Sequence, residues 1–285
     1  YYYKEGISTL KDERKKKEKT TEDDYYPGFD ELELEDREES PYLIFTIKDS
    51  KGETVRKITK PATKGINRVV WDFKYSSLTA RFSDNDRSGR WALPGTYTVT
   101  ISKSVNGEIT NLGITESFNC IPLNNNTLAA TDKEALQEFS NKVAELRRVV
   151  NGVGLYHKEM KEHLDKIKIA AKYSTLNAER LKEIKELEER LYKIEEALYG
   201  DKTRSSREFE TTPGISSRIN TVVWNVYNST SAPTQTYLDN YQIAYDLTKP
   251  VIAELEAITV SIESLKDSLD QIKAPYTPGR LPKLD

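Results

Sequence analysis

The segment from Asp84 to Gly89 has the residue types and spacing of the first half of a calcium-binding loop. Asp84, Asp86 and Ser88 would supply short oxygen side chains at positions 1, 3 and 5, and Gly89 would permit the sharp turn after them. The twelfth position is Gly95, where such a loop requires a bidentate glutamate. The pattern is therefore incomplete, and a polar loop between strands is the simpler interpretation.

No other pattern assembles a catalytic or metal site. His157 and His163 are six residues apart and do not share a helical face. The single cysteine, Cys120, excludes an internal disulfide and a cysteine-based zinc site. No G-x-S-x-G, Walker, H-E-x-x-H or dinucleotide-binding pattern occurs. We therefore expect no catalytic residue and no cofactor in this chain.

Aromatic residues offer a different chemistry, because sugars stack on exposed rings. The chain has 17 tyrosines and three tryptophans. Trp71 and Tyr97 lie in strand patterns and Trp224 lies in a helical pattern, and such rings are usually part of a core. Trp91, beside the Pro94-Gly95 turn, is the candidate for contact with a ligand.

Short β-type runs separated by turns occupy the first 123 residues. The run YLIFTIK at 42–48 is followed by a turn and a return strand at 54–58, and residues 65–73 alternate. A further strand at 97–105 leads through Asn106-Gly107, a strong hairpin signal, into its partner. Strands at this spacing predict a β-sandwich over 1–123.

Residues 11–40 interrupt that pattern with charge. They contain 7 basic and 13 acidic residues, and Pro27-Gly28 divides them. We interpret the segment as a solvated helical hairpin or a mobile insertion. A polybasic contact site is the alternative, which the interleaved acidic residues disfavour.

Long helical patterns follow a short linker at 124–130. Apolar residues recur in alternating steps of three and four, which predicts a helix that keeps one stripe against partner helices. This seam consists of Leu136, Phe139, Val143, Leu146, Val150, Val153, His157, Met160, Leu164 and Ile167. His157 is its polar member, and a polar residue at one seam position often sets the packing register.

The remaining patterns predict helices at about 177–199, 215–228 and 234–272, the last containing Pro250. Thr131 and Glu134 have the spacing of a capping box at the start of the first helix. We expect an α+β multidomain chain in which an elongated antiparallel bundle of three to four helices occupies 131–273 and a tail occupies 274–285. We favour an arrangement in which the two long helices form two columns and the two shorter helices, placed end to end, form a third. A four-helix up-down bundle is the alternative.

Composition narrows the class of protein. A net charge of −3 argues against a general nucleic-acid binder. Hydrophobic residues make up 36% of the chain and no apolar run reaches the roughly 18 residues of a membrane span. The only methionine is Met160, so we expect a processed form or a fragment.

Several strings resemble a known protein family. IKDSKGETVRKI, KGINRVVWDFKY and LPGTYTVTI are similar to the Ig-like module of flagellar hook-capping type. FDELELEDREESP, EEALYG, STSAPT and APYTPGRLPKLD resemble the C-terminal region of BNR-repeat, sortilin-like β-propeller proteins of Bacteroidota, often labelled glycosyl hydrolases. The resemblance covers essentially the whole chain, and its helical strings are the more specific.

The resemblance implies export to the periplasm, the outer membrane or the cell surface. It also implies that a β-propeller precedes the chain in its parent and would hold any glycan or peptide site. No catalytic residue is carried over, because no BNR-type repeat occurs in this sequence.

Three functions follow as hypotheses. The leading one is a non-catalytic accessory region that packs on its own propeller and offers a helical surface to a protein partner, with Val149, Tyr156 and Ile169 as candidates for a second contact face. The alternatives are the C-terminal part of a glycan-active enzyme, in which Trp91 touches the substrate, and a structural spacer at the cell envelope.

Overall fold

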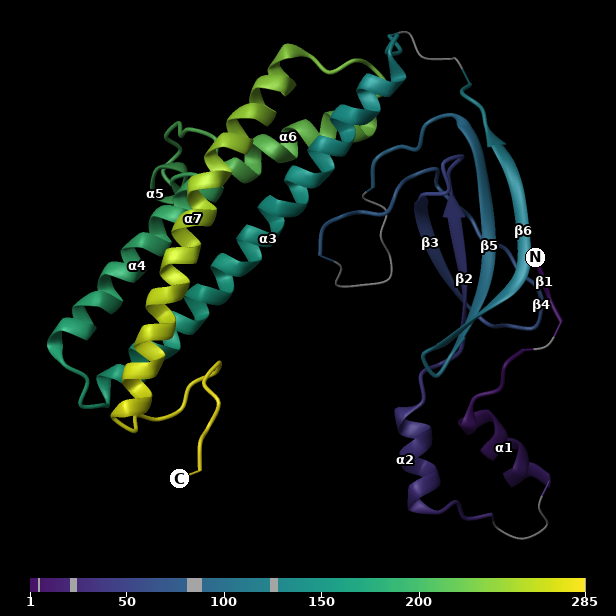
Figure 1. Cartoon of the computed structure of the whole chain (residues 1–285), viewed down its shortest axis with the longest axis horizontal. Helices are drawn as coiled ribbons and strands as arrows, with labels where there is room; N and C mark the ends of the chain where they lie inside the picture. Colours follow the sequence, from purple (N-terminus) through teal and green to yellow (C-terminus); the bar gives the residue numbers. More distant parts are fainter. Residues whose placement is uncertain (5, 21–24, 81–88, 124–127, 285) are drawn as a thin grey trace. The chain divides into compact units, whose positions relative to one another are not determined.

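A computed structural model of the chain describes residues 1–4, 6–20, 25–80, 89–123 and 128–284 (Figure 1). The chain divides into two compact units. The first, here called the sheet unit, comprises Tyr1–Ser77 and Asn85–Asn126, and the second, the helical unit, comprises Leu78–Asp84 and Thr127–Asp285. The expectation of a chain that combines helices and strands is confirmed.

The sheet unit contains a four-stranded antiparallel sheet in the order β3-β2-β5-β6. Its strands are β2 (Tyr42–Lys48), β3 (Thr54–Pro61), β5 (Gly95–Val105) and β6 (Glu108–Cys120). Both expected hairpins are present. Asn106 and Gly107 have φ values of 51° and 80°, as a tight two-residue hairpin turn requires. The Asp49 carboxylate accepts hydrogen bonds from the backbone of Lys51 and Glu53 and so closes the other turn.

Alternation along the central strands places apolar residues on one face of this sheet. Leu43, Phe45 and Ile47 of β2 are buried, and so are Tyr97 and Ile101 of β5. They pack against irregular segments and against the N-terminal residues. A two-stranded antiparallel ribbon of β1 (Tyr2–Tyr3) and β4 (Gly65–Ile66) is the second sheet.

Of the strand expected over 65–73, only the first two residues form a strand, since β4 ends at Ile66. Local hydrogen bonds turn the chain instead: Trp71 Nε1 donates to the Lys74 carbonyl, and the Asp72 carboxylate accepts from Lys74 N. Phe73 has a φ of 56°, outside the strand region. Ile66 and Phe73 are consequently exposed.

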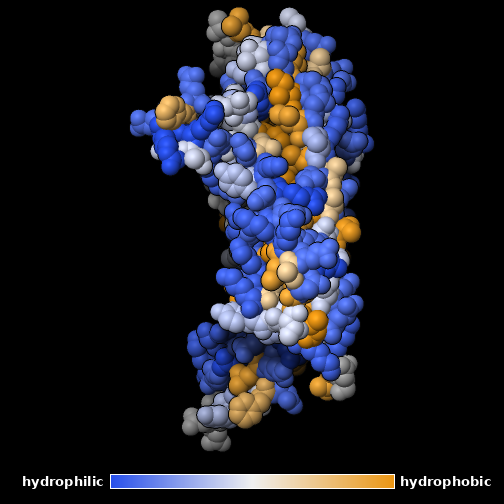
Figure 2. Space-filling view, turned by 90° about the vertical axis from the view of Figure 1, so that its left-hand side faces the viewer, coloured by the Kyte–Doolittle hydropathy of each residue, from blue (hydrophilic) through white to orange (hydrophobic). Residues whose placement is uncertain are grey.

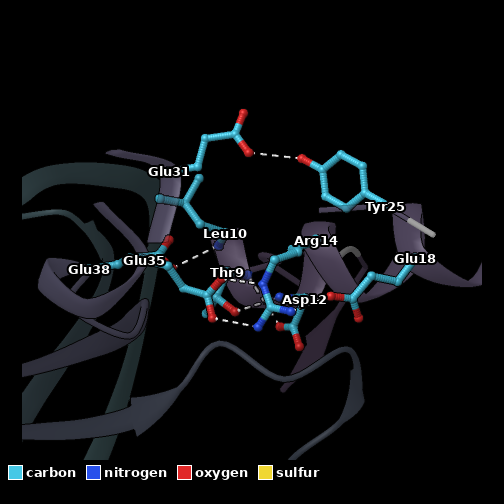
Figure 3. A network of polar contacts seen from close by, with 9 residues as sticks. All are labelled: Thr9, Leu10, Asp12, Arg14, Glu18, Tyr25, Glu31, Glu35 and Glu38. Atoms are coloured by element: carbon cyan, nitrogen blue, oxygen red, sulfur yellow. Dashed lines mark hydrogen bonds and ion pairs between the residues drawn. The ribbon is translucent and has the colours of Figure 1, made fainter. Parts of the chain in front are cut away.

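The charged segment forms two helices, α1 (Leu10–Thr20) and α2 (Phe29–Arg37), which contact each other. The Arg14 guanidinium donates to both carboxylate oxygens of Glu35, at 2.7 and 3.0 Å (Figure 3). Glu38 accepts from Leu10 N at 2.7 Å. Neither helix has a buried residue, so polar contacts hold the pair together, as a solvated pair of helices would require.

The helical unit consists of α3 (Lys133–Lys172), α4 (Ala178–Tyr199), the short α5 (Lys202–Ser205), α6 (Ile215–Asn228) and α7 (Gln235–Gln271). Helices α4, α6 and α7 match the predicted ranges to within one residue at each end. Each of the four longer helices contacts the other three (Figure 1). They share one hydrophobic core. The N-cap of α3 is Asp132, whose side chain accepts from Ala135 N at 2.8 Å; the expected cap at Thr131 is wrong by one residue.

The tail after α7 folds back onto the helical unit as far as Arg280. The Arg280 side chain is 1% exposed and donates to the Asp270 carboxylate and to the Pro275 carbonyl. Gly279 has a φ of 82°, and a Cβ at this position would lie within 3.4 Å of His163 and Lys266. The glycine therefore lets the tail pass close over these two side chains.

Candidate functional site

The predicted seam of α3 faces the core of the helical unit. Eight of its ten residues are buried, and Leu136 and Phe139 near the start of the helix are partly buried. Val143, Leu164 and Ile167 are at most 1% exposed. Burial on this scale stabilises the unit by roughly 1.5–3 kcal/mol for each large side chain. The seam is thus a packing stripe, unavailable to a partner in the folded chain.

His157 is 4% exposed and lies 2.9 Å, through Nε2, from the carbonyl oxygen of Leu191 in α4. A carbonyl oxygen only accepts, so Nε2 carries the proton and donates. This bond ties α3 to the backbone of α4 at one level. The contact agrees with the interpretation of His157 as a register residue.

A groove of about 420 Å³ opens beside His157, where α3, α4 and α6 meet. Asn151 and Leu155 of α3, Glu195 and Tyr199 of α4 and Asn220 of α6 are among its lining residues. Tyr199 fits because of Gly154, where an added Cβ would lie 2.6 Å from the Tyr199 hydroxyl oxygen. The glycine in the middle of α3 is thereby explained by a close side-chain approach.

Glu195 is the charged centre of this groove. It accepts from Lys161 Nζ at 2.8 Å and also from Lys202 Nζ. These two hydrogen bonds lower the pKa of the Glu195 carboxyl from 4.5 to about 2. The group is therefore ionised throughout the physiological range, and it is unsuited to act as a general acid at neutral pH.

Trp224 in α6 is 72% exposed, so the expectation that this ring belongs to the core is wrong. The buried residues of α6 include Ile219, Val222 and Val226. At about 100° per residue, Trp224 lies roughly 200° from Val222 and points to the opposite side of the helix. It shares its face with Asn220, one turn earlier, which lines the groove. The helical periodicity of α6 already indicated that Trp224 is exposed. The prediction placed it in the core because tryptophan is usually a core residue.

A second, more apolar groove of about 440 Å³ lies between α3 and α7. Its walls include Val153 and Tyr156 of α3 and Ile252 and Leu255 of α7. Figure 2 shows that the visible surface is mainly hydrophilic, with hydrophobic residues gathered in a few patches. Of the proposed second contact face, Tyr156 is 37% and Ile169 54% exposed, whereas Val149 packs partly against the core.

The other candidate residues lie in the sheet unit or outside the described residues. Trp91 belongs to the sheet unit, where it is 42% exposed and Lys74 Nζ lies 4.7 Å from its ring centroid. Asp84, Asp86 and Ser88 lie outside the described residues. Within the described part of the chain, no group of three or more histidine, cysteine, aspartate or glutamate residues is placed to hold a metal ion. No helix there is both long and apolar enough to cross a bilayer.

Comparison with known proteins adds no relative. No protein-family model matches this chain, and neither a curated protein nor a solved structure matches it.

Proposed function

We propose that this chain is a non-catalytic accessory region of an exported β-propeller protein, and that its helical unit presents a docking surface to a protein partner. In this interpretation the sheet unit is an Ig-like sandwich and the helical unit an elongated bundle. The resemblance of the strings quoted above supports the first part of the proposal.

The exposure of Trp224 supports the second part. Tryptophan is enriched among the residues that contribute most binding energy at protein interfaces. Here a ring 72% exposed to solvent stands on the same helical face as Asn220, beside a groove that also contains the partly exposed Leu155. A partner side chain that enters the groove would contact Leu155 while the partner's surface covers the indole.

Photo-crosslinking in the cells that produce the protein tests this surface. A photoreactive amino acid replaces Trp224, and in a matched control it replaces Phe209, which is 68% exposed elsewhere in the helical unit. We expect one discrete crosslinked protein from position 224, none from position 209, and loss of that product when Leu155→Lys is added. The same product from both positions, or none from position 224, would refute the docking surface.

The glycan-active parent remains a second candidate, because Trp91 presents a half-exposed ring in the sheet unit. A glycan array with the full-length parent and with its Trp91→Ala variant decides between the two. Retention of glycan binding by the variant removes Trp91 as a contact residue.

A further inference from the structure

β6 is an edge strand of 13 residues, and its edge away from β5 has no partner strand among the described residues. Antiparallel pairing leaves a row of backbone N–H and C=O groups on such an edge, which is a template for another strand. A register shift opposite Ile101/Ser102, with Gly113 at a φ of 70°, interrupts the first half of β6. The regular template is therefore the stretch 114–120.

The two edges of this sheet differ in how they are protected. Strand β3, at the opposite edge, carries Lys57, Lys60 and Pro61, the residue types that discourage pairing with a further strand. Strand β6 contains no lysine, arginine or proline from Glu108 to Cys120. The devices that β6 does carry are the register shift at Gly113 and the inward-facing Glu116. Its regular stretch therefore suits an added strand that brings a cation to this carboxylate, whereas β3 is guarded by lysines and a proline.

The buried face of the sheet is also incomplete at β6. Ile101 of β5 is 8% exposed, but its cross-strand neighbour Ile114 in β6 is 46% exposed. Glu116, two residues along the same face, lies opposite Val99 and is exposed. No ion-pair partner is found for Glu116 among the described residues. An added strand would cover Ile114 and place a side chain next to this carboxylate.

From these three observations we propose that the 114–120 edge of β6 binds an extended segment of a partner protein by β-strand addition, and that this segment carries lysine or arginine two residues away from a β-branched apolar residue, on the same face. The cation faces Glu116 and the apolar residue packs on Ile114. A second copy of β6 does not fit, because antiparallel registers centred on this stretch bring the two Glu116 side chains to within about 8 Å with no cation between them.

The binding site lies in the sheet unit, whereas the docking surface around Trp224 lies in the helical unit. Strand addition draws its affinity from main-chain hydrogen bonds and its specificity from alternate side chains. Synthetic peptides test the two contributions separately, because backbone donors and side chains can be changed one at a time.

The test uses the full chain and a fluorescently labelled seven-residue peptide in which valine and lysine alternate at every second position, so that both lie on one face of the strand, with threonine at the positions between them. We expect saturable binding by fluorescence anisotropy below about 1 mM peptide, and slower amide hydrogen exchange confined to residues 114–120. The same peptide with alternate backbone nitrogens methylated keeps its charge but loses donors, and it should bind at least about tenfold more weakly. A peptide with glutamate in place of lysine should also bind more weakly.

Variants of the protein complete the test. Glu116→Lys should weaken binding by about fivefold to tenfold, since it removes one attraction and adds one repulsion. Glu159→Lys, the same charge change on an exposed position of α3, should leave binding within about twofold, and circular dichroism verifies that both variants fold. Absence of saturable binding, equal binding of the methylated peptide, or no effect of Glu116→Lys would overturn the proposal. A dimer of the chain that Ile114→Lys abolishes would overturn it in favour of a second copy.

Discussion

Replacement of Glu195 by glutamine should weaken the helical unit at neutral pH and have much less effect in acid. Glu195 joins three helical elements, because Lys161 belongs to α3, Glu195 to α4 and Lys202 to α5. Its side chain is 16% exposed, whereas those of the two lysines are 52% and 67% exposed. The carboxylate is thus held by two hydrogen bonds but is still screened by solvent.

The size of this loss of stability follows from the shift in the pKa of Glu195. The two lysines lower the pKa of Glu195 from 4.5 to about 2, which corresponds to at most about 3 kcal/mol of stability. Because both lysines are more than half exposed, we expect about 1 kcal/mol. A lowered pKa means that the folded state binds the proton more weakly than the unfolded state. The stabilisation is therefore fully present above pH 4.5 and is lost as the pH falls toward 2.

Urea denaturation followed by far-UV circular dichroism, which reports mainly on the helices, measures this effect. We expect Glu195→Gln to lower the free energy of unfolding by about 1 kcal/mol at pH 7 and by less than half of that at pH 3. Glu159→Gln, an exposed glutamate in α3 for which no ion pair is found among the described residues, is the matched control and should show no difference at either pH. Equal stability of wild type and Glu195→Gln at pH 7, or an undiminished difference at pH 3, would refute the reasoning.

Two glycines should respond to alanine in opposite directions. In Gly214→Ala the new Cβ would lie 2.7 Å from Gly200 N and Leu198 O, so we expect a loss of more than about 2 kcal/mol in thermal denaturation. Gly152→Ala in α3 has nothing within 4 Å and should gain about 0.5–1 kcal/mol; a loss there would contradict the open space. Leu198→Ala removes a side chain that is 0% exposed and should cost about 2–5 kcal/mol by urea denaturation, a result below 1 kcal/mol arguing against its burial. Arg280→Ala leaves Asp270 without its guanidinium partner, so limited proteolysis should cut the tail after residue 273 faster than in wild type, and an unchanged rate would show that this contact does not hold the tail.

Much of the fold was predictable because its signals are local. The helices at 178–199, 215–228 and 235–271 follow from apolar spacing within each segment, and the turn at Asn106-Gly107 follows from two residues that tolerate positive φ. The strand predicted over 65–73 ends at Ile66, because the Trp71 and Asp72 side chains compete with the sheet for the backbone of Lys74. Their hydrogen bonds to Lys74 offer the backbone a turn that competes with the sheet.

The candidate site was less predictable. Periodicity alone places Trp224 away from Val222, and yet a tryptophan in a helix is usually interpreted as core. The ion pairs of Glu195 join residues 34 and 7 positions apart, and nothing in a charge-rich sequence distinguishes this glutamate from its neighbours in α4. Because carboxylates and lysines are abundant, the sequence does not show which of them form ion pairs. That depends on which helices lie side by side.

The sequence by itself determined helices α4, α6 and α7, the two hairpins of the sheet and which stripe of α3 is buried, because 3.6-residue and two-residue periods are properties of the local chain. It also determined that α1 and α2 stay solvated, since neither has enough apolar residues to form a core. Only the tertiary structure decided what each exposed position faces. The glycine at position 154 is explained only by the Tyr199 side chain that lies against it. Glu195 differs from its neighbours only because lysines from α3 and α5 contact it. The edge of β6 is unpaired only because the sheet ends at this strand. Contacts between residues distant in sequence depend on how elements pack, which no single segment encodes.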